Sequence, residues 1–147
     1  PRGLPGPTGE RNVYQLHPRQ RVLCLAADPA DRLAQLAAVL AVGAQAVWPA
    51  EAKAEWARLP IDVLTHVAVA ADWRAPQVAF EAVLLHGDAA AALDVAPVLA
   101  ERPGPIAGLT LLAPGSADVP LERLLNERAV SVNTAAAGGN ASLMTMG

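Results

Sequence analysis

Aromatic residues, cysteine and basic charge are all scarce in this chain of 147 residues. Aromatic residues make up 3% of the sequence and hydrophobic residues 53%, so Ala, Leu and Val must build most of the core. Eleven basic and fourteen acidic residues give a net charge of -3 without a basic cluster, which argues against a nucleic-acid or anionic-membrane partner. The single cysteine, Cys24, excludes an internal disulfide and is typical of a reducing compartment.

Several signals of function are also missing. No apolar run approaches the roughly 18 residues of a membrane-spanning helix, and the N-terminus lacks the layout of a secretion signal, so we expect a cytoplasmic protein without a membrane span. The sequence has neither a Gly-x-Gly-x-x-Gly fingerprint nor a Gly-Lys-Ser/Thr phosphate loop. Its histidines lack the spacing of a metal site. We therefore expect no catalytic residues, no cofactor site and no metal site in this chain.

What the sequence does contain is an alternation of short apolar runs and helical patterns. It predicts strands at 21–26, 44–48, 62–70, 82–86, 106–113 and 129–133, and helices at 29–42, 51–58, 89–101 and 121–127. This order predicts a three-layer α/β fold, Rossmann-like, with a mostly parallel sheet and helices on both faces. Pro97 is expected to kink or split its helix.

The sequence divides into three parts by composition. Residues 1–19 are rich in proline and glycine, which favours a linker or an extended arm. Residues 20–130 carry the α/β pattern, and residues 131–147 form a tail of small side chains. Because the chain begins at Pro1 within a Pro/Gly-rich run, we interpret it as a piece of a longer protein.

The first expected helix begins after Asp28, a good N-cap, and ends at Gly43. Its apolar spacing predicts one buried face, formed by Leu33, Leu36, Ala37 and Leu40.

Few single residues suggest chemistry. Cys24 lies between leucines inside a strand, so we expect a buried and inert thiol. His66 is expected within a strand as an ordinary sheet residue. His86 ends a strand just before Gly87, where α/β proteins place binding loops, yet a loop role is favoured over a catalytic one. Asp88, like Asp28, is most simply an N-cap.

The tail has the most unusual composition. Gly138 and Gly139 permit a sharp turn, and the small neighbouring side chains allow close approach to another surface. Leu143, Met144 and Met146 would then anchor against an apolar partner. A disordered tail fits the same composition, and composition alone does not separate the two.

Four runs of residues resemble the C-terminal portion of the proline utilization A (PutA) family: 5–12, 16–19, 21–25 and 133–144. The likeness extends over nearly the whole chain, more loosely between residues 50 and 100. It implies a bifunctional parent protein with an FAD-dependent proline dehydrogenase and an NAD-dependent glutamate-semialdehyde dehydrogenase. By this resemblance, FAD and NAD belong to the parent and none to this chain.

The central part resembles a degenerate aldehyde dehydrogenase cofactor domain. Trp48 stands where that family has a lysine that contacts the adenosine ribose. In the turn under the cofactor phosphates Gly87 is kept, but Asp88 replaces a serine and Ala92 a glycine. Leu109 stands where a general-base glutamate is expected. Each departure removes a contact, so the resemblance implies the fold without dehydrogenase chemistry.

The resemblance implies a non-catalytic C-terminal domain. It would pack on the dehydrogenase module and help to close the passage that carries the intermediate between active sites. Residues 131–147 would act as a clasp or flap. Its interaction residues are expected to be Asn133, Thr134, Gly138, Gly139, Asn140, Leu143 and Met144.

Two alternatives remain at this point. An oligomerisation module would bring the tail to a second subunit. A self-standing nucleotide-binding enzyme would need NAD affinity, against which Trp48, Asp88 and Ala92 argue. The parent is expected in the cytoplasm, either free or peripheral at the inner membrane face.

Overall fold

A computed structural model describes residues 1–5 and 10–133. The chain divides into two compact units. Of the described residues, unit 1 contains 1–5, 10–17 and 126–133, and unit 2 is Pro18–Leu125. Of the predicted clasp at residues 131–147, residues 134–147 lie outside the described residues, and with them Thr134, Gly138, Gly139, Asn140, Leu143 and Met144.

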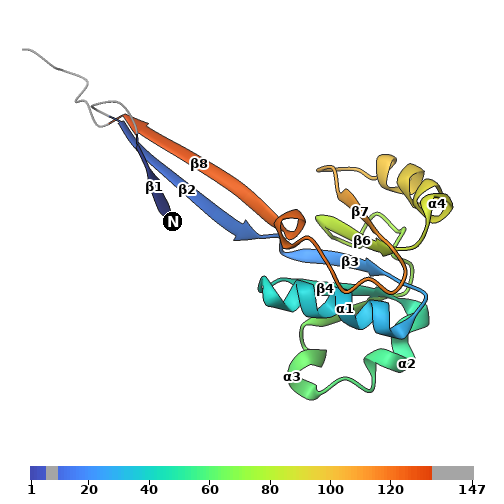
Figure 1. Cartoon of the computed structure of the whole chain (residues 1–147). Coiled ribbons are helices and arrows are strands. Elements are labelled where there is room, and N and C mark those ends of the chain that lie inside the picture. The colour runs from blue at the N-terminus through green and yellow to red at the C-terminus, as the bar shows by residue number, and fades with distance from the viewer. Residues whose placement is uncertain (6–9, 134–147) are drawn as a thin grey trace, which may run out of the picture. The chain divides into compact units, whose positions relative to one another are not determined.

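Unit 2 is built on a five-stranded parallel sheet (Figure 1). Its strands are β3 (Arg21–Leu25), β4 (Gln45–Pro49), β5 (Val67–Ala70), β6 (Ala82–His86) and β7 (Gly108–Leu112). Their spatial order is β5-β4-β3-β6-β7, and each neighbouring pair is parallel. The α/β fold predicted from the alternating pattern is confirmed.

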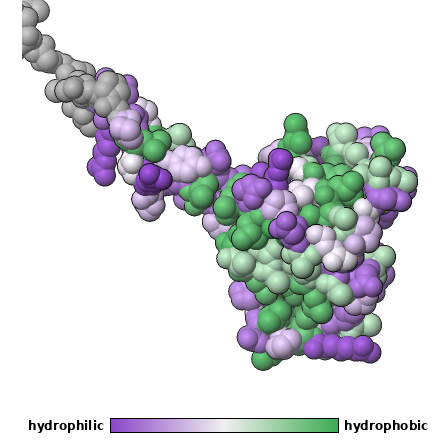
Figure 2. Space-filling model, in the orientation of Figure 1, coloured by the Kyte–Doolittle hydropathy of each residue, from purple (hydrophilic) through white to green (hydrophobic). Residues whose placement is uncertain are grey.

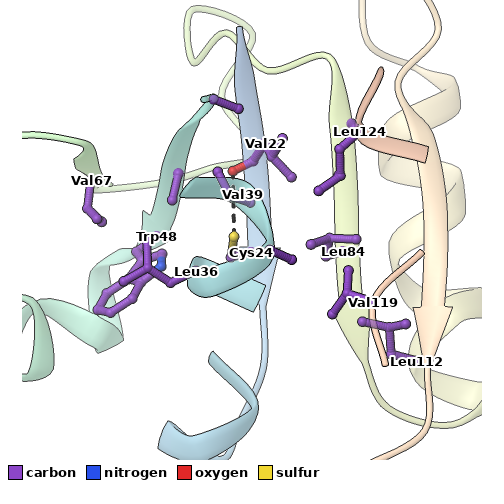
Figure 3. Close-up of a cluster of buried hydrophobic side chains, with 14 of the residues drawn as sticks. Val22, Cys24, Leu36, Val39, Trp48, Val67, Leu84, Leu112, Val119 and Leu124 are labelled. Atoms are coloured by element: carbon purple, nitrogen blue, oxygen red, sulfur yellow. Dashed lines mark hydrogen bonds between the residues drawn. The ribbon is translucent and has the colours of Figure 1, made fainter. Parts of the chain in front are cut away.

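The sheet is covered on both faces, because its central strands are apolar at successive positions. Val22 and Cys24 of β3 point to one face, where they pack with Leu36, Trp48 and other buried side chains (Figure 3). That face is covered by α1 (Pro29–Ala41) and by the segment that contains Val119 and Leu124. On the other face Leu23 and Leu25 pack with Trp73, Phe80 and side chains of α4 (Ala89–Ala100).

Helix α1 begins as predicted. The Asp28 side chain accepts a hydrogen bond from the N–H of Ala30 at 2.7 Å, and Pro29 occupies the first turn, where its missing N–H costs nothing. Gly43, with φ of 78°, follows the helix end in a conformation that favours glycine.

The predicted buried face of α1 is wrong in part. Leu33 is 50% exposed and Ala37 is exposed, whereas Leu36 is buried. The buried residues of the helix are Asp31, Arg32, Gln35, Leu36, Ala38 and Val39. The stripe expected from periodicity is shifted by about one position from the buried face of α1. The shift arises because three polar side chains of α1 have partners inside the fold.

The segment predicted as one strand at residues 62–70 contains two elements. Ile61–Leu64 forms the short helix α3, and only Val67–Ala70 forms a strand. The alternating pattern was misleading there because Pro60 starts a helical turn, in which the N–H of Leu64 donates to the Pro60 carbonyl at 2.8 Å. His66 is consequently an exposed turn residue and not a strand residue. The preceding segment forms a 3-10 turn, η1 (Ala50–Ala52), and the helix α2 (Lys53–Trp56).

Helix α4 runs through Pro97 as one element, so the proline does not split it. Asp88 caps its N-terminus, as predicted, by accepting a hydrogen bond from the N–H of Ala91 at 2.9 Å. Apolar side chains remain exposed on α4 and in or near β7, among them Leu93, Ile106 and Leu111. Figure 2 shows hydrophobic areas on the surface of unit 2.

Unit 1 is a three-stranded sheet in the order β1-β2-β8. The strands are β1 (Arg2–Leu4), β2 (Glu10–Pro18) and β8 (Leu125–Asn133), and β1 pairs antiparallel with β2. The composition of residues 1–19 indicated a linker or extended arm and did not predict this pairing.

The end of the described chain also differs from the prediction. The helix predicted at 121–127 is the 3-10 turn η2 (Leu121–Leu124), and β8 begins four residues before the strand predicted at 129–133. Among the described residues, no helix is long and apolar enough to cross a membrane.

Candidate functional site

The strand order of unit 2 reverses between β3 and β6. From β3 the chain continues to β4 and β5 on one side, and it then returns to add β6 and β7 on the other side. In open α/β sheets, ligands bind outside the carboxyl ends of the strands at such a switch point. Four polar or charged residues of unit 2 are buried, and all lie on α1 or at the end of β6: Asp31, Arg32, Gln35 and His86.

Gln35 joins the ends of the two strands. Its side-chain nitrogen donates to the Leu25 carbonyl of β3 at 3.0 Å and lies 3.3 Å from the Leu84 carbonyl of β6. These carbonyls fix which end of the amide is the nitrogen. The same nitrogen lies 2.9 Å from Nδ1 of His86, so Nδ1 is the acceptor and carries no proton.

The other nitrogen of His86 holds the segment that follows β7. Nε2 lies 2.8 Å from the Ser116 carbonyl, to which it donates in the tautomer that carries the proton on Nε2. The Asp31 carboxylate accepts a hydrogen bond from the N–H of Gly115 at 2.9 Å and lies 3.9 Å from Nε2 of His86. We call residues 113–120 the strap.

Arg32 fills the β4 side of the same region. Its guanidinium donates to the Ala26 carbonyl, just beyond β3, and forms an ion pair with Glu55 of α2. The guanidinium carbon also lies 5.8 Å from the centre of the Trp48 ring. The side chain of Arg32 is only 4% exposed, so this charge is neutralised inside the protein and does not face solvent.

The crevice at the switch point is therefore occupied by the chain itself. A ligand site needs convergent polar groups that can reach a ligand. Here Asp31 and His86 contact the backbone of the strap, and Gln35 contacts two strand carbonyls. These contacts tie the ends of β3 and β6 to the strap.

Sequence reasoning singled out His86 here and missed Asp31, Arg32 and Gln35. A signal was present, because these three residues interrupt the apolar pattern of α1 at positions that lie on one helical face. Their roles depend on the strap and on the ends of β3, β4 and β6, which sequence alone does not bring together.

The positions that resemble a cofactor domain all have packing roles. Trp48 is fully buried against Leu36 in the core under α1 (Figure 3). Leu109 is half-buried in the core under α4. The Leu109 side chain has no polar group, and the fully buried Trp48 does not face solvent.

The residues of the turn between β6 and α4 also make packing and capping contacts. A Cβ atom at Gly87 would lie 3.0 Å from the Cβ atom of Ala91, so glycine permits the close approach of α4. The Asp88 carboxylate is used as the helix cap, and Ala92 packs against the core on the α4 face. An acidic side chain at this N-terminus also opposes phosphate binding.

Two candidates remain. Cys24 is buried, and His66 is exposed. Burial raises the pKa of the Cys24 thiol to about 12, and the nearby Arg32 offsets this only in part. Within residues 1–5 and 10–133, no group of three or more His, Cys, Asp or Glu side chains is arranged to hold a metal ion.

Unit 1 presents a different kind of surface. Arg2 pairs with Tyr14 across β1 and β2, so their side chains share a face of the sheet, and Leu4 and Leu16 share it at 43% and 51% exposure. An open hollow of about 710 Å³ is lined by Pro1, Arg2, Leu4, Tyr14, Gln15 and Leu16. Desolvation and a hydrogen bond to Glu127 raise the pKa of the Tyr14 hydroxyl.

The comparisons with known proteins agree with this architecture. No family model matches the chain. It is 51% identical over 146 residues to the bifunctional protein PutA of Salmonella typhimurium and 40% identical over 153 residues to the bifunctional protein PutA of Rhizobium meliloti. Each alignment covers 98% of this chain. This chain is a homologue of the C-terminal region of PutA.

The alignment covers only a small part of these PutA relatives. The chain spans 11% of the Salmonella protein and 12% of the Rhizobium protein. A crystal structure of a proline utilization A (PutA) mutant from Bradyrhizobium japonicum matches 76% of this chain and 13% of that chain, with a TM-score of 0.59 and 24% identity. At that identity the structural match supports the fold alone.

Proposed function

We propose that the chain is a non-catalytic C-terminal domain of a bifunctional proline-catabolic enzyme. It packs on the dehydrogenase module of the same polypeptide and helps to close the passage that carries the reactive intermediate between two active sites. In this proposal FAD and NAD bind elsewhere in the polypeptide. Walls that exclude bulk water protect an intermediate from side reactions, which gives such a domain a physical purpose.

The observation that carries the proposal is the position of the strap at the switch point between β3 and β6. The strap is held over the ends of β3 and β6 by Asp31 and His86, so the place where this fold binds a nucleotide is taken by the chain. A domain that keeps the fold but occupies its own ligand site is suited to a structural role.

The sheet of unit 1 supplies the packing surface in this proposal. A small sheet gains stability when one of its faces packs against another surface. Leu4 and Leu16 expose apolar area beside the Tyr14 hydroxyl, which is the mixed character of a protein contact.

A second candidate is an oligomerisation module of the same enzyme. The observation that favours it is β8, a nine-residue strand at the end of the β1-β2-β8 order. An edge strand can add a strand from another chain, so a second subunit is a suitable partner.

The deciding experiment uses the full-length polypeptide with Leu4→Asp and Leu16→Asp together. Both charges would be placed on the proposed packing surface and would oppose its burial. From proline, we expect a new lag in NADH production while each half-reaction measured alone is unchanged. Ile61→Asp, at a residue of unit 2 that is 78% exposed, is the matched control and should leave no lag.

Light scattering on the same variants separates the two candidates. An intact reaction sequence with an altered oligomer would support the oligomerisation module. If neither coupling nor assembly changes, the packing role of this surface is wrong. Deleting residues 131–147 applies the same readouts to the tail.

The non-catalytic assignment has its own test. Equilibrium binding of NAD to the full-length polypeptide should give the stoichiometry of the dehydrogenase module alone. Binding at one further site per polypeptide, abolished by disrupting unit 2, would contradict the proposal.

A further inference from the structure

Three buried polar atoms have no hydrogen-bond partner among the described residues: Arg32 Nε, Gln35 Oε1 and Trp48 Nε1. The residues that carry them are almost inaccessible, since Arg32 is 3% exposed and both Gln35 and Trp48 are 0% exposed. Buried polar atoms normally have partners, so three in one region call for a physical explanation.

Two of the three side chains project from α1, and Trp48 lies in the core on the sheet face that α1 covers. Arg32 and Gln35 are three positions apart on its buried face, which makes their side chains neighbours. They donate to the carbonyls of consecutive residues, Ala26 and Leu25, at the end of β3. Trp48 lies beside Arg32, with its ring centre 5.8 Å from the Arg32 guanidinium carbon.

The unpaired atoms include both donors and an acceptor. Arg32 Nε and Trp48 Nε1 are N–H donors, and Gln35 Oε1 is a carbonyl acceptor. The Gln35 amide cannot simply turn over, because its oxygen would then face the carbonyls of Leu25 and Leu84.

We propose that these three atoms bind one internal water molecule between α1, β3 and β4. A water accepts two hydrogen bonds and donates two, so it can accept from Arg32 and Trp48 and donate to Gln35. An anion would face the Gln35 oxygen, and the Arg32 charge is already paired with Glu55. A cation would face two N–H donors, and an apolar occupant would leave all three atoms unpaired.

The proposed site lies on the face of the sheet that α1 covers, where Trp48 is part of the core. The water therefore fixes the Trp48 ring and the first turns of α1 in the arrangement that keeps the core closed. This inference concerns unit 2 alone and does not depend on the partner of unit 1.

A crystal structure of the full-length polypeptide, at a resolution that shows ordered water, tests the proposal directly. We expect one density peak within about 2.7–3.2 Å of both Trp48 Nε1 and Gln35 Oε1. No peak, or a Trp48 Nε1 that donates to a protein acceptor, would overturn it.

A matched pair of variants extends the test. Trp48→Phe removes one donor and should abolish or displace the peak. Trp56→Phe removes an indole whose Nε1 already donates to the Val67 carbonyl at 2.8 Å, and the peak should remain. An unchanged peak in Trp48→Phe would contradict the proposed coordination.

Nuclear magnetic resonance of the wild-type chain provides a measurement that needs no variant. The indole N–H of Trp48 should show a cross-peak to a long-lived water, and the indole N–H of Trp56 should not. Absence of the Trp48 cross-peak in the folded chain would refute the site.

Discussion

The carboxylate of Asp31 accepts a hydrogen bond from the backbone N–H of Gly115 at 2.9 Å, across 84 positions of sequence. Asp31 lies in the first turn of α1, and Gly115 lies in the strap that follows β7. The contact closes the edge of the sheet at which ligands bind in this kind of fold. One buried acidic side chain therefore stabilises this edge of the sheet.

Asp31→Ala should lower the free energy of unfolding by about 1–3 kcal/mol, because it leaves a strap N–H without its acceptor. Urea denaturation measures this change, and hydrogen exchange at Gly115 should accelerate with it. Asp118→Ala is the control, since Asp118 is an exposed strap residue. Equal effects of the two substitutions would contradict the proposed strap contact.

Leu36→Ala should destabilise unit 2 by about 2–5 kcal/mol, because Leu36 is buried in the core under α1. Leu33→Ala, on the same helix at a half-exposed position, should stay within about 0.5 kcal/mol. The unfolding free energies of the two variants measure which face of α1 is buried. Equally large losses in both variants would instead fit the face expected from periodicity, which contains both Leu33 and Leu36.

Arg102→Lys should also destabilise unit 2, by about 1–3 kcal/mol. The guanidinium of Arg102 donates to several carbonyls between Trp73 and Val78 and stacks 4.2 Å from the centre of the Phe80 ring. A lysine ammonium cannot reproduce this planar arrangement. Arg74→Lys is the control, since Arg74 is exposed and stacks only on Trp73. Thermal unfolding distinguishes the two variants.

The Cys24 thiol should react with a thiol reagent only when the chain unfolds. Its pKa is raised to about 12 by burial, so the thiolate is absent at neutral pH. The folded state then holds its proton more tightly than the unfolded state does. The contribution of Cys24 to the free energy of unfolding is complete below the unfolded pKa of about 8.5. It is lost as the pH rises toward about 12.

Alkaline unfolding of the wild type and of Cys24→Ala measures this linkage. The wild type should lose more stability between about pH 9 and pH 12 than the variant does. Rapid labelling of Cys24 in the folded chain at neutral pH would show that the thiol is accessible and would refute the expectation.

The strands of unit 2 were largely predictable from local sequence. Continuous apolar runs mark β3, β4 and β6, because both faces of a central parallel strand are buried. Asp28 and Asp88 mark the helix starts through their capping side chains. The short helix α3 was missed because four residues that start at Ile61 also fit an alternating strand.

The sheet of unit 1 was not predictable in the same way. Prolines and glycines dominate the first residues, yet β1 and β2 pair, and β8 joins the same sheet from the far end of the chain. Pairing between distant segments follows from tertiary contacts, and composition does not encode it.

By itself, the sequence determined the α/β fold, the helix caps, the inert Cys24 and the likeness to PutA, because each depends on neighbouring residues or on a continuous match. Only the tertiary structure decided that Asp31, Gln35 and His86 share one site. Their partners Gly115, Ser116 and Leu84 lie far away in sequence, and the fold alone brings them within hydrogen-bond distance. Burial then makes each polar contact necessary, since an unpaired polar group in the core is costly.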